Sequence, residues 1–330
     1  MNDNSMTRRS VLKGTGLAFV AFGGIRISEG FASQGSPSSE IQVPCSAGTQ
    51  RPKFKVPANA CDCHHHIYDP ARFRYVPEDK RNQPPGTVEH YRLLQKRLGT
   101  TRSVIVQPSA YGLDNSCTLD ALQQLGSNAR AVTVIQPTAS DAELKRMQSL
   151  GVCGIRINLA SAIKVVPVDK IEPLSRRVNE LGWHMAFWIE ADDIVELEDL
   201  LMRLPTPLVF DHLAHLPQPA GTDHPAFRIV CKLIDKGKTW VKVSGAYLDT
   251  KIGPPTYADT SKLAKAYVKY APERMVWGSD WPHPVMWGLK KPWPDDALLL
   301  DLLAEWAPNE ATRHQILVDN PARLYGFGAA

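Results

Sequence analysis

The sequence predicts an α/β fold, a (β/α)8 TIM barrel, and the arrangement of its apolar segments supports this. From about residue 58 onward, eight short apolar runs alternate with segments of helical spacing. Near-continuous apolar strands joined by helices indicate parallel pairing in a sheet covered on both faces. Polar residues gather at the C-terminal ends of the runs, where such barrels carry their chemistry. A doubly wound open sheet is the alternative, but no glycine-rich phosphate-binding motif follows any strand.

The predicted strands are short and rich in β-branched and apolar residues, as buried parallel strands are. They comprise the run around His64 and residues 102–107, 131–136, 152–158, 184–190, 207–212, 239–244 and 275–279. The predicted helices are residues 88–98, 116–125, 140–150, 168–181, 192–204, 223–236 and 257–270, with 295–306 and 310–318 after the last strand. Ser140 and Glu143 form a capping-box pattern that marks one helix start.

The N-terminal residues 1–33 are predicted to be a twin-arginine-type signal peptide. Residues 7–13 read Thr-Arg-Arg-Ser-Val-Leu-Lys, and the apolar run after them is too short and weak to span a bilayer comfortably. We therefore expect the twin-arginine export machinery as a partner, removal of the signal, a periplasmic location and no stable membrane anchor. Residues 34–57 are predicted to be a flexible lead-in, and residues 58–330 the barrel domain.

The charge balance argues against nucleic acid as a partner. The chain has a formal net charge of +4, and residues 1–33 carry four basic and two acidic residues, so the remainder is at +2. No run of lysine or arginine offers a stripe for phosphates. The six cysteines are scattered in apolar segments and do not predict a disulfide framework. A small-molecule substrate is the expected partner.

The stretch Asp62-Cys63-His64-His65-His66 opens the first predicted strand. Side chains alternate between the two faces of a strand, so Asp62, His64 and His66 are predicted to share one face. Two imidazoles that project together can hold a divalent metal or polarise a carbonyl group. Polar residues at the ends of the other predicted strands are Arg156, Asn158, Trp188, Glu190, Asp211, His212, Ser244 and Asp280. Because buried charges cost free energy unless they are paired, this gathering indicates a functional site.

These residues resemble the amidohydrolase superfamily, in its amidohydrolase-related branch. The resemblance rests on Asp62-x-His64-x-His66, on His212, and on residues 277–284, which read Trp-Gly-Ser-Asp-Trp-Pro-His-Pro. Further segments similar to the 2-pyrone-4,6-dicarboxylate lactonases and galactarolactone isomerases of that branch are residues 75–78, 106–108, 181–184, 211–212 and 318–325. The resemblance covers roughly residues 58–326.

The resemblance implies a hydrolase that opens a small carboxylated or sugar-acid lactone. Asp280 would be the general base that activates water. His64, His66 and His212 would polarise the lactone carbonyl, directly or through a metal. Arg156 would anchor a substrate carboxylate by paired hydrogen bonds. The other predicted substrate-binding residues are Asn158, Trp188, His215, Tyr247 and His283.

The resemblance leaves metal dependence and reaction type open. His64, His66 and Asp280 could hold Zn²⁺ with a water, since three protein ligands suffice in a catalytic zinc site. Metal-dependent members place a histidine on the fifth strand, which here ends at Trp188 and Glu190, so metal-independent chemistry is the other expectation. A lactone isomerase, a metal-dependent decarboxylase and a non-catalytic binding protein for a small carboxylate are the alternatives. Asp280 favours hydrolysis, because the isomerases have asparagine there.

Overall fold

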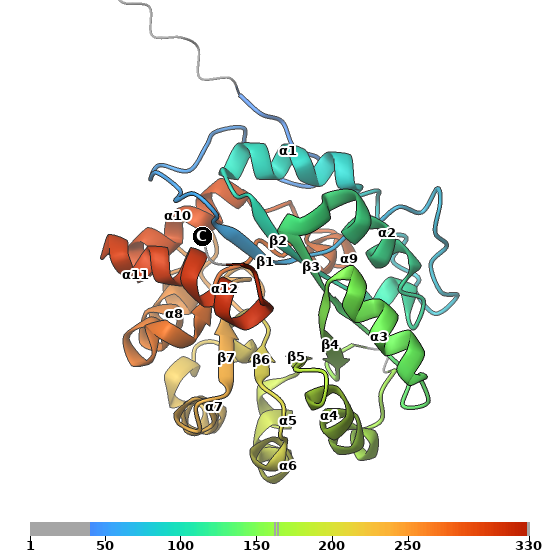
Figure 1. Ribbon diagram of the computed structural model, residues 1–330. Coiled ribbons are helices and arrows are strands. Elements are labelled where there is room, and N and C mark those ends of the chain that lie inside the picture. Colours follow the sequence, from blue (N-terminus) through green and yellow to red (C-terminus); the bar gives the residue numbers. More distant parts are fainter. Residues whose placement is uncertain (1–39, 162, 164, 329–330) are drawn as a thin grey trace, which may run out of the picture. The chain divides into compact units, whose positions relative to one another are not determined.

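Eight parallel strands form one sheet in chain order, as the sequence predicted (Figure 1). The structure is a computed structural model that describes residues 40–161, 163 and 165–328, so the predicted signal peptide lies outside the described residues. The strands are β1 Cys61–His65, β2 Arg102–Val106, β3 Ala129–Thr133, β4 Val152–Asn158, β5 His184–Trp188, β6 Leu208–Phe210, β7 Thr239–Lys242 and β8 Met275–Val276. Neighbouring strands pair in parallel from β1 to β8. The result is a nearly closed (β/α)8 barrel.

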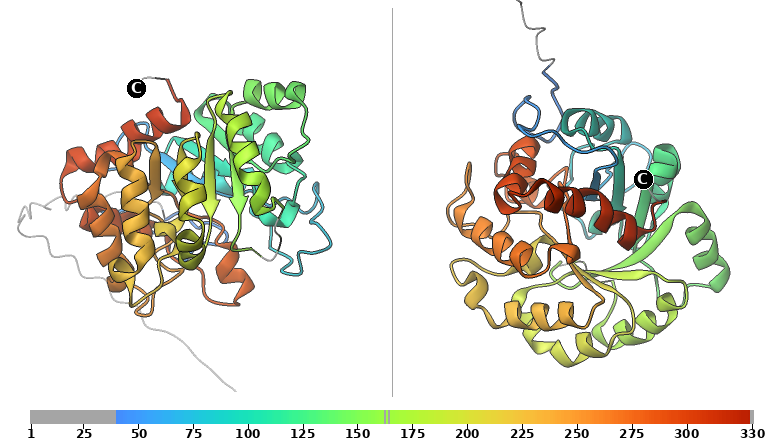
Figure 2. Two further views of the ribbon diagram at one scale, coloured as in Figure 1. Left: turned by 90° about the horizontal axis from the view of Figure 1, so that it is seen from below. Right: turned by 60° about the vertical axis from the view of Figure 1, so that its left-hand side comes forward.

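Helices lie between and after the strands, most of them on the outside of the barrel, as the two further views show (Figure 2). They are α1 Val88–Leu98, α2 Ser116–Leu125, α3 Asp141–Leu150, α4 Ile171–Asn179, α5 Ala191–Glu196, α6 Glu198–Arg203, α7 Pro225–Asp235, α8 Ala258–Tyr270, α9 Pro284–Gly288, α10 Asp296–Trp306, α11 Glu310–His314 and α12 Asn320–Tyr325. The predicted helix 192–204 is divided at Leu197, and the predicted helix 310–318 continues through a π-helical turn into α12. In the described part of the chain, no helix is long and apolar enough to cross a membrane.

The barrel closes where β1 meets the segment after β8. The Cys63 amide donates to the Trp277 carbonyl at 2.9 Å, and the Asp280 amide donates to the His64 carbonyl at 2.7 Å. Gly278 permits this approach, because a Cβ there would lie 2.6 Å from the Cβ of His64. The closure brings the strand-8 end of the sequence directly against the histidines of strand 1.

The prediction that Asp62 shares a face with His64 and His66 is wrong. The pairing of β1 with β2 shifts register between Asp62 and His65, so the simple alternation of sides is broken there. Asp62 instead accepts hydrogen bonds from Tyr91 Oη of α1 at 3.1 Å and from Ser279 Oγ at 2.7 Å. It therefore fastens the junction of β1, β8 and α1 and does not enter the site.

The opposite end of the barrel is filled by apolar side chains. Cys61 and Cys63 belong to a buried cluster that includes Trp240, Tyr325 and Phe327, so the C-terminal segment covers this end. The full cluster adds Val104, Val106, Val132, Ala186, Val209 and Val276. His184 lies beside Tyr325, and His65 stacks on Tyr91 with ring centres 3.5 Å apart, so both histidines point away from the strand-end site.

Part of the segment expected to be a flexible lead-in is packed on the barrel. Val43 is fully buried, and the Pro44 carbonyl accepts a hydrogen bond from the Trp281 indole at 2.8 Å. The buried Arg97 guanidinium donates to the Gln50 carbonyl at 2.8 Å and to the Ala47 carbonyl at 2.9 Å. These contacts satisfy a buried arginine, which explains why the segment is held although its composition is typical of a linker.

Candidate active site

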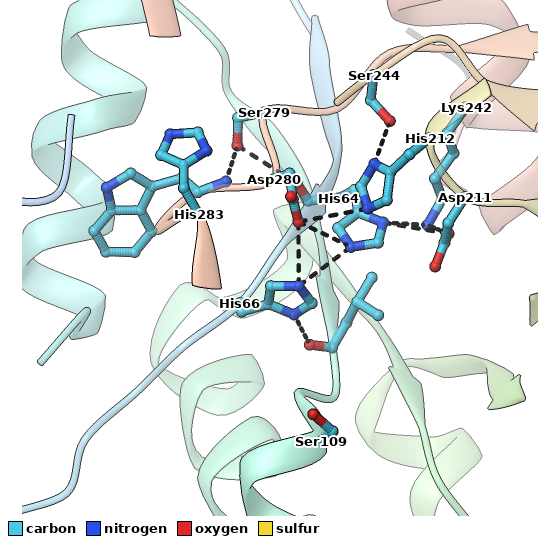
Figure 3. A network of polar contacts seen from close by, with 12 residues as sticks. His64, His66, Ser109, Asp211, His212, Lys242, Ser244, Ser279, Asp280 and His283 are labelled. Atoms are coloured by element: carbon cyan, nitrogen blue, oxygen red, sulfur yellow. Dashed lines mark hydrogen bonds and ion pairs between the residues drawn. The ribbon is translucent and has the colours of Figure 1, made fainter. Parts of the chain in front are cut away.

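Three imidazoles converge on one carboxylate oxygen at the C-terminal end of the barrel (Figure 3). Asp280 Oδ1 lies 3.3 Å from His66 Nε2, 3.5 Å from His64 Nε2 and 3.6 Å from His212 Nε2. His64 Nε2 and His66 Nε2 are 3.3 Å apart. All four side chains are buried, with Asp280 2% exposed. The sequence placed these four residues together, and the structure brings them into direct contact.

The hydrogen bond on the far nitrogen of His66 determines what the near nitrogen can do. His66 Nδ1 lies 2.7 Å from the Val106 carbonyl oxygen, which can only accept, so Nδ1 carries the hydrogen. Burial lowers the pKa of His66. The ring is therefore neutral, and Nε2 presents a lone pair toward Asp280 Oδ1. His66 is an acceptor in this site.

A buried lysine determines the protonation of His64 in the same way. Lys242 of β7 is fully buried, and its Nζ lies 2.9 Å from His64 Nδ1 and 3.0 Å from Asp211 Oδ1. An ammonium group held by a carboxylate is a donor, so it donates to Nδ1 and leaves the hydrogen of the neutral imidazole on Nε2. Burial and the charge of Lys242 lower the pKa of His64, which keeps the ring neutral. His64 is thus an N–H donor pointing into the site.

His212 is placed by an unusual stretch of backbone. The turn His212–His215 has positive φ at four consecutive residues, between 48° and 59°. A left-handed conformation at a residue other than glycine costs about 1–2 kcal/mol, and it persists only where the surroundings enforce it. Here it sends His212 Nε2 toward Asp280, while His212 Nδ1 lies 3.0 Å from Ser244 Oγ. Because His212 Nε2 faces the Asp280 carboxylate, which accepts, the hydrogen of the ring belongs on Nε2 and the Ser244 hydroxyl donates to Nδ1.

The charges of the site follow from burial and from these neighbours. Burial alone would raise the pKa of Asp280, but the neighbouring His212 outweighs burial and holds this pKa well below its usual value. Burial lowers the pKa of His212 to about 4. At neutral pH the site therefore combines an ionised carboxylate with three uncharged imidazoles.

A cavity opens in front of this cluster. Its lining comprises His66, Tyr68, Arg81, Pro108, Ser109, Arg156, Trp188, His212, Leu248, Asp280, Pro284 and Val285. The wall of the cavity thus includes the Asp280 carboxylate, the imidazoles of His66 and His212, and the guanidinium groups of Arg81 and Arg156.

Arg156 is held rigidly but keeps one donor free. Its Nη2 lies 3.3 Å from Asp211 Oδ2, its Nη1 donates to the Gln107 carbonyl at 3.1 Å, and its guanidinium stacks over the Trp188 ring. The buried Nε has no hydrogen-bond partner among the described residues. A buried donor without an acceptor in a cavity wall suits a ligand anion.

Arg81, in the loop between β1 and α1, is the second cationic wall residue. Its Nε and Nη2 donate to the two oxygens of Asp79 at 3.0 and 2.6 Å, and Nη2 also donates to Ser109 Oγ at 2.9 Å. These bonds leave Nη1 for another acceptor. The side chain is 27% exposed, so it lies at the edge of the cavity.

Four of the predicted substrate-binding residues lie outside the cavity wall. His215 pairs with Asp249 at 3.3 Å, and Asn158 accepts from the Ser161 amide at 3.1 Å. Tyr247 and His283 lie behind Asp280, in a hydrogen-bonded chain described below. Only Arg156 and Trp188 of this predicted set line the cavity with the catalytic candidates.

Sequence reasoning missed Lys242 and Arg81. Lys242 is the one ionisable residue in an apolar strand, Thr239–Lys242, and a charged side chain in such a strand was the signal that could have found it. Arg81 follows Asp79 in an irregular loop, and nothing in the local pattern indicates that this loop folds back over the strand ends.

The spacing of the ligand atoms suits a metal, but the protonation of His64 does not. His64, His212 and Asp280 offer ligand atoms within 4.8 Å of one another, and ligands of a tetrahedral zinc ion lie about 3.3 Å apart. A metal-binding imidazole needs a lone pair on the nitrogen that faces the ion. The Lys242 ammonium places the hydrogen of His64 on that nitrogen. The residues as arranged therefore do not fit a metal bound through His64.

Comparison with known proteins identifies the family of this chain. Residues 61–327 match the family model described as amidohydrolase. The chain is 35% identical over 289 residues to a 2-pyrone-4,6-dicarboxylate hydrolase of Comamonas testosteroni, covering 84% of this chain and 94% of the relative. It is 36% identical over 278 residues to a 4-sulfomuconolactone hydrolase of Rhizobium radiobacter, covering 83% and 92%. It is 32% identical over 291 residues to a D-galactarolactone isomerase of Agrobacterium fabrum, covering 87% and 97%.

These similarities define a (β/α)8 enzyme of the amidohydrolase superfamily. The chain belongs to the amidohydrolase family of the matching model.

Replacing Lys242 with methionine tests the protonation argument. In the wild type, His64 Nδ1 lies 3.3 Å from Asp211 Oδ1. Without the ammonium, Nδ1 can carry the hydrogen and donate it to Asp211. Nε2 then has a lone pair and can bind a metal. We expect Lys242→Met to raise zinc affinity at least about tenfold over the wild type, the size of effect that partners behind a metal ligand have. Calorimetric titration of metal-free protein measures it, with circular dichroism to check folding and the exposed Lys251→Met as control. Equal zinc affinity in wild type and variant would contradict the argument.

Proposed function

We propose that the protein is a hydrolase that opens a small lactone carrying an anionic group. The observation that supports it best is the arrangement around Asp280 Oδ1. Two acceptors, Asp280 Oδ1 and His66 Nε2, lie 3.3 Å apart and face two imidazole donors. Two of the relatives are named as hydrolases of a pyrone dicarboxylate and of a sulfomuconolactone, both lactones with anionic groups.

The two acceptors suit the attacking water. A water beside both, on the cavity side, donates one hydrogen to Asp280 Oδ1 and the other to His66 Nε2, which directs its oxygen lone pair at the lactone carbonyl. Asp280 takes the proton as the carbon–oxygen bond forms. An ionised carboxylate is required for this step, and the lowered pKa of Asp280 provides it at neutral pH.

The two donors suit the developing oxyanion. His64 Nε2–H and His212 Nε2–H stabilise the negative oxygen of the tetrahedral intermediate, as preorganised donors do in a buried site. When the intermediate collapses, the ring carbon–oxygen bond breaks and Asp280 returns its proton to the leaving ring oxygen. The product is an open-chain hydroxy acid, and Asp280 is again ionised.

We propose that this chemistry proceeds without a metal. The Lys242 ammonium beside His64 Nδ1 supports this, because it keeps His64 a donor. A metal-dependent decarboxylase would need a lone pair on His64 Nε2, and therefore the hydrogen on Nδ1. An isomerase on the same barrel would need no nucleophilic water, and the paired acceptors at Asp280 and His66 favour hydrolysis over it.

The cationic part of the cavity wall defines the substrate class. Arg156 Nε and Arg81 Nη1 are free of the bonds that hold their guanidinium groups. A carboxylate or sulfonate substituent on the lactone would accept from both. The remaining lining near them, Tyr68, Pro108 and Trp188, favours a small planar ring.

Asp280→Asn tests hydrolysis against binding. We expect kcat on a panel of anionic lactones to fall about 10²- to 10⁴-fold, the contribution of a general base, while the Kd for the open-chain product stays within about threefold. Stopped assays and calorimetry measure the two quantities, with Asp120→Asn on the surface as control.

Elemental analysis and chelation accompany the wild-type assay. A wild type that binds these lactones without turning them over would support the binding-protein alternative instead, and loss of activity on chelation would contradict the metal-free proposal.

Arg81→Met tests the anion contact. A charged hydrogen bond to substrate contributes about 1.5–3 kcal/mol, so we expect KM for an anionic lactone to rise about 10- to 100-fold with kcat within about threefold. The KM for a neutral lactone of the same ring should not change. Arg72→Met is the matched control, since Arg72 lies in the same loop but pairs with Asp120 on the surface. Equal effects on the anionic and the neutral lactone would contradict an anion contact.

We also propose that the protein is exported to the periplasm by the twin-arginine route. The pattern Thr7-Arg8-Arg9 with the apolar run after it supports this. Cell fractionation of the full chain tests it: the wild type is expected in the periplasmic fraction, and the Arg8→Lys, Arg9→Lys double variant in the cytoplasm. Equal distribution of the two proteins would contradict export by this route.

A further inference from the structure

A buried chain of hydrogen bonds leads away from the second oxygen of Asp280. Tyr247 Oη lies 2.5 Å from Asp280 Oδ2, His283 Nδ1 lies 2.9 Å from Tyr247 Oη, and His283 Nε2 lies 3.2 Å from Asp296 Oδ2. His283 and Asp296 are fully buried, and Tyr247 is 6% exposed. The chain joins the loop after β7, the turn after β8 and the first residue of α10. Neither Tyr247, His283 nor Asp296 lines the cavity in front of Asp280.

The direction of each hydrogen bond follows from the groups themselves. An ionised carboxylate only accepts, so the single hydrogen of the Tyr247 hydroxyl points to Asp280 Oδ2. The Tyr247 oxygen must then accept from His283, which requires the hydrogen on His283 Nδ1. Burial and the charge of Asp280 raise the pKa of Tyr247 well above its usual value, so the hydroxyl keeps its hydrogen.

The opposite direction is disfavoured by the geometry. If His283 Nε2–H donated to Asp296 while a neutral His283 Nδ1 accepted from Tyr247, the phenol hydrogen would leave Asp280. Two lone-pair oxygens would then face each other at 2.5 Å in a buried site. The hydrogen on His283 Nδ1 therefore sets the direction of the chain, from His283 to Tyr247 and from Tyr247 to Asp280.

We infer that Tyr247 is a positioning residue for Asp280 and that His283 orients the Tyr247 hydroxyl. The inference deepens the proposed function and rests on it for its catalytic consequence. The backbone of Asp280 is already fixed on both sides, by its amide on the His64 carbonyl and by the His283 amide on its own carbonyl. The remaining freedom is rotation of the carboxylate about the bond from Cβ.

Tyr247 removes that freedom. With Oδ2 occupied, Oδ1 is the one oxygen left to face the three imidazoles and to take a proton from water. Without the hydroxyl, the carboxylate can turn, and the attacking water loses its fixed acceptor. The expected loss is therefore in kcat and not in KM, because Tyr247 contacts no substrate.

Tyr247→Phe is the first test. We expect kcat on the best lactone to fall about 10- to 100-fold with KM within about threefold, since a misplaced acceptor of this kind costs that much. Tyr270→Phe is the matched control, because Tyr270 Oη also donates to a carboxylate, that of Asp235, at 2.8 Å on the surface. It is expected to leave both constants unchanged. A Tyr247→Phe variant with full kcat would overturn the inference.

Two replacements of His283 separate orientation from packing. Asparagine can place its amide nitrogen where Nδ1 was, whereas the longer glutamine places it where Nε2 was. We expect His283→Asn to keep most of kcat and His283→Gln to lose as much as Tyr247→Phe. The Tyr247→Phe, His283→Gln double variant should be no slower than Tyr247→Phe alone, because both remove one interaction. Equal losses in the two His283 variants, or additive losses in the double variant, would indicate packing alone and overturn the inference.

A readout that needs no substrate separates this inference from the proposed function. The Tyr247 hydroxyl hydrogen should give a proton resonance downfield of the amide region. It should be absent in Tyr247→Phe, shifted in His283→Gln and little changed in His283→Asn. If the wild type shows this pattern but opens no lactone, the proposed function fails and the positioning stands. If lactones are opened while the resonance is missing from the wild type, the positioning fails alone.

Discussion

The burial of one carboxylate is the constraint on which the rest of the site depends. Asp280 is nearly inaccessible to water, and an isolated charge in such a place costs several kcal/mol. Its two oxygens therefore face polar hydrogens, the N–H groups of His64 and His212 near Oδ1 and the Tyr247 hydroxyl on Oδ2. These two imidazoles are uncharged, so they solvate the negative charge of Asp280 without neutralising it. The positive charges that neutralise the Asp280 carboxylate must therefore lie farther away.

A second set of buried charges provides these positive charges. Lys242 and Arg156 both contact Asp211, so two cations share one carboxylate beneath the imidazoles. With Asp280 included, this group of four charges is neutral overall. Burial would raise the pKa of Asp211, but the charge of Lys242 outweighs burial and holds this pKa well below its usual value. The same ammonium that balances the charge also places the hydrogen on His64 Nε2, so charge balance and donor chemistry come from one residue.

The sequence predicted the parts of the molecule that follow from periodicity and failed where the backbone departs from it. The bounds of β4, α1 and α2 were predicted correctly, because each is a long apolar or amphipathic pattern with clear ends. The sixth strand was predicted to reach His212, but it ends at Phe210 because the chain turns left-handed two residues later. Period-two alternation likewise fails at the register shift in β1.

For the site, the sequence identified the residues but not their hydrogen-bonding roles. Strand-end position and the resemblance to the family identified Asp280, His64, His66 and His212. Neither could show that His66 accepts while His64 donates, because those roles depend on Val106 and Lys242, which lie on other strands. Arg81 depends on the path of a loop, and loop paths follow from contacts distant in sequence.

The positive-φ residues show which part of the site is fixed by its own backbone. His212–His215, Asp280 and His283 all have left-handed backbone in buried surroundings, at about 1–2 kcal/mol each. Asp280 and His212, fixed by such strain, cannot adjust to different substrates, and in the proposed reaction they need no adjustment if the lactone carbonyl is the same. The cavity wall also contains loop residues without this constraint, such as Arg81 and Leu248. These positions are free to vary. One barrel can therefore keep the arrangement of its carboxylate and imidazoles while the charge and shape of the loop part of the cavity wall change.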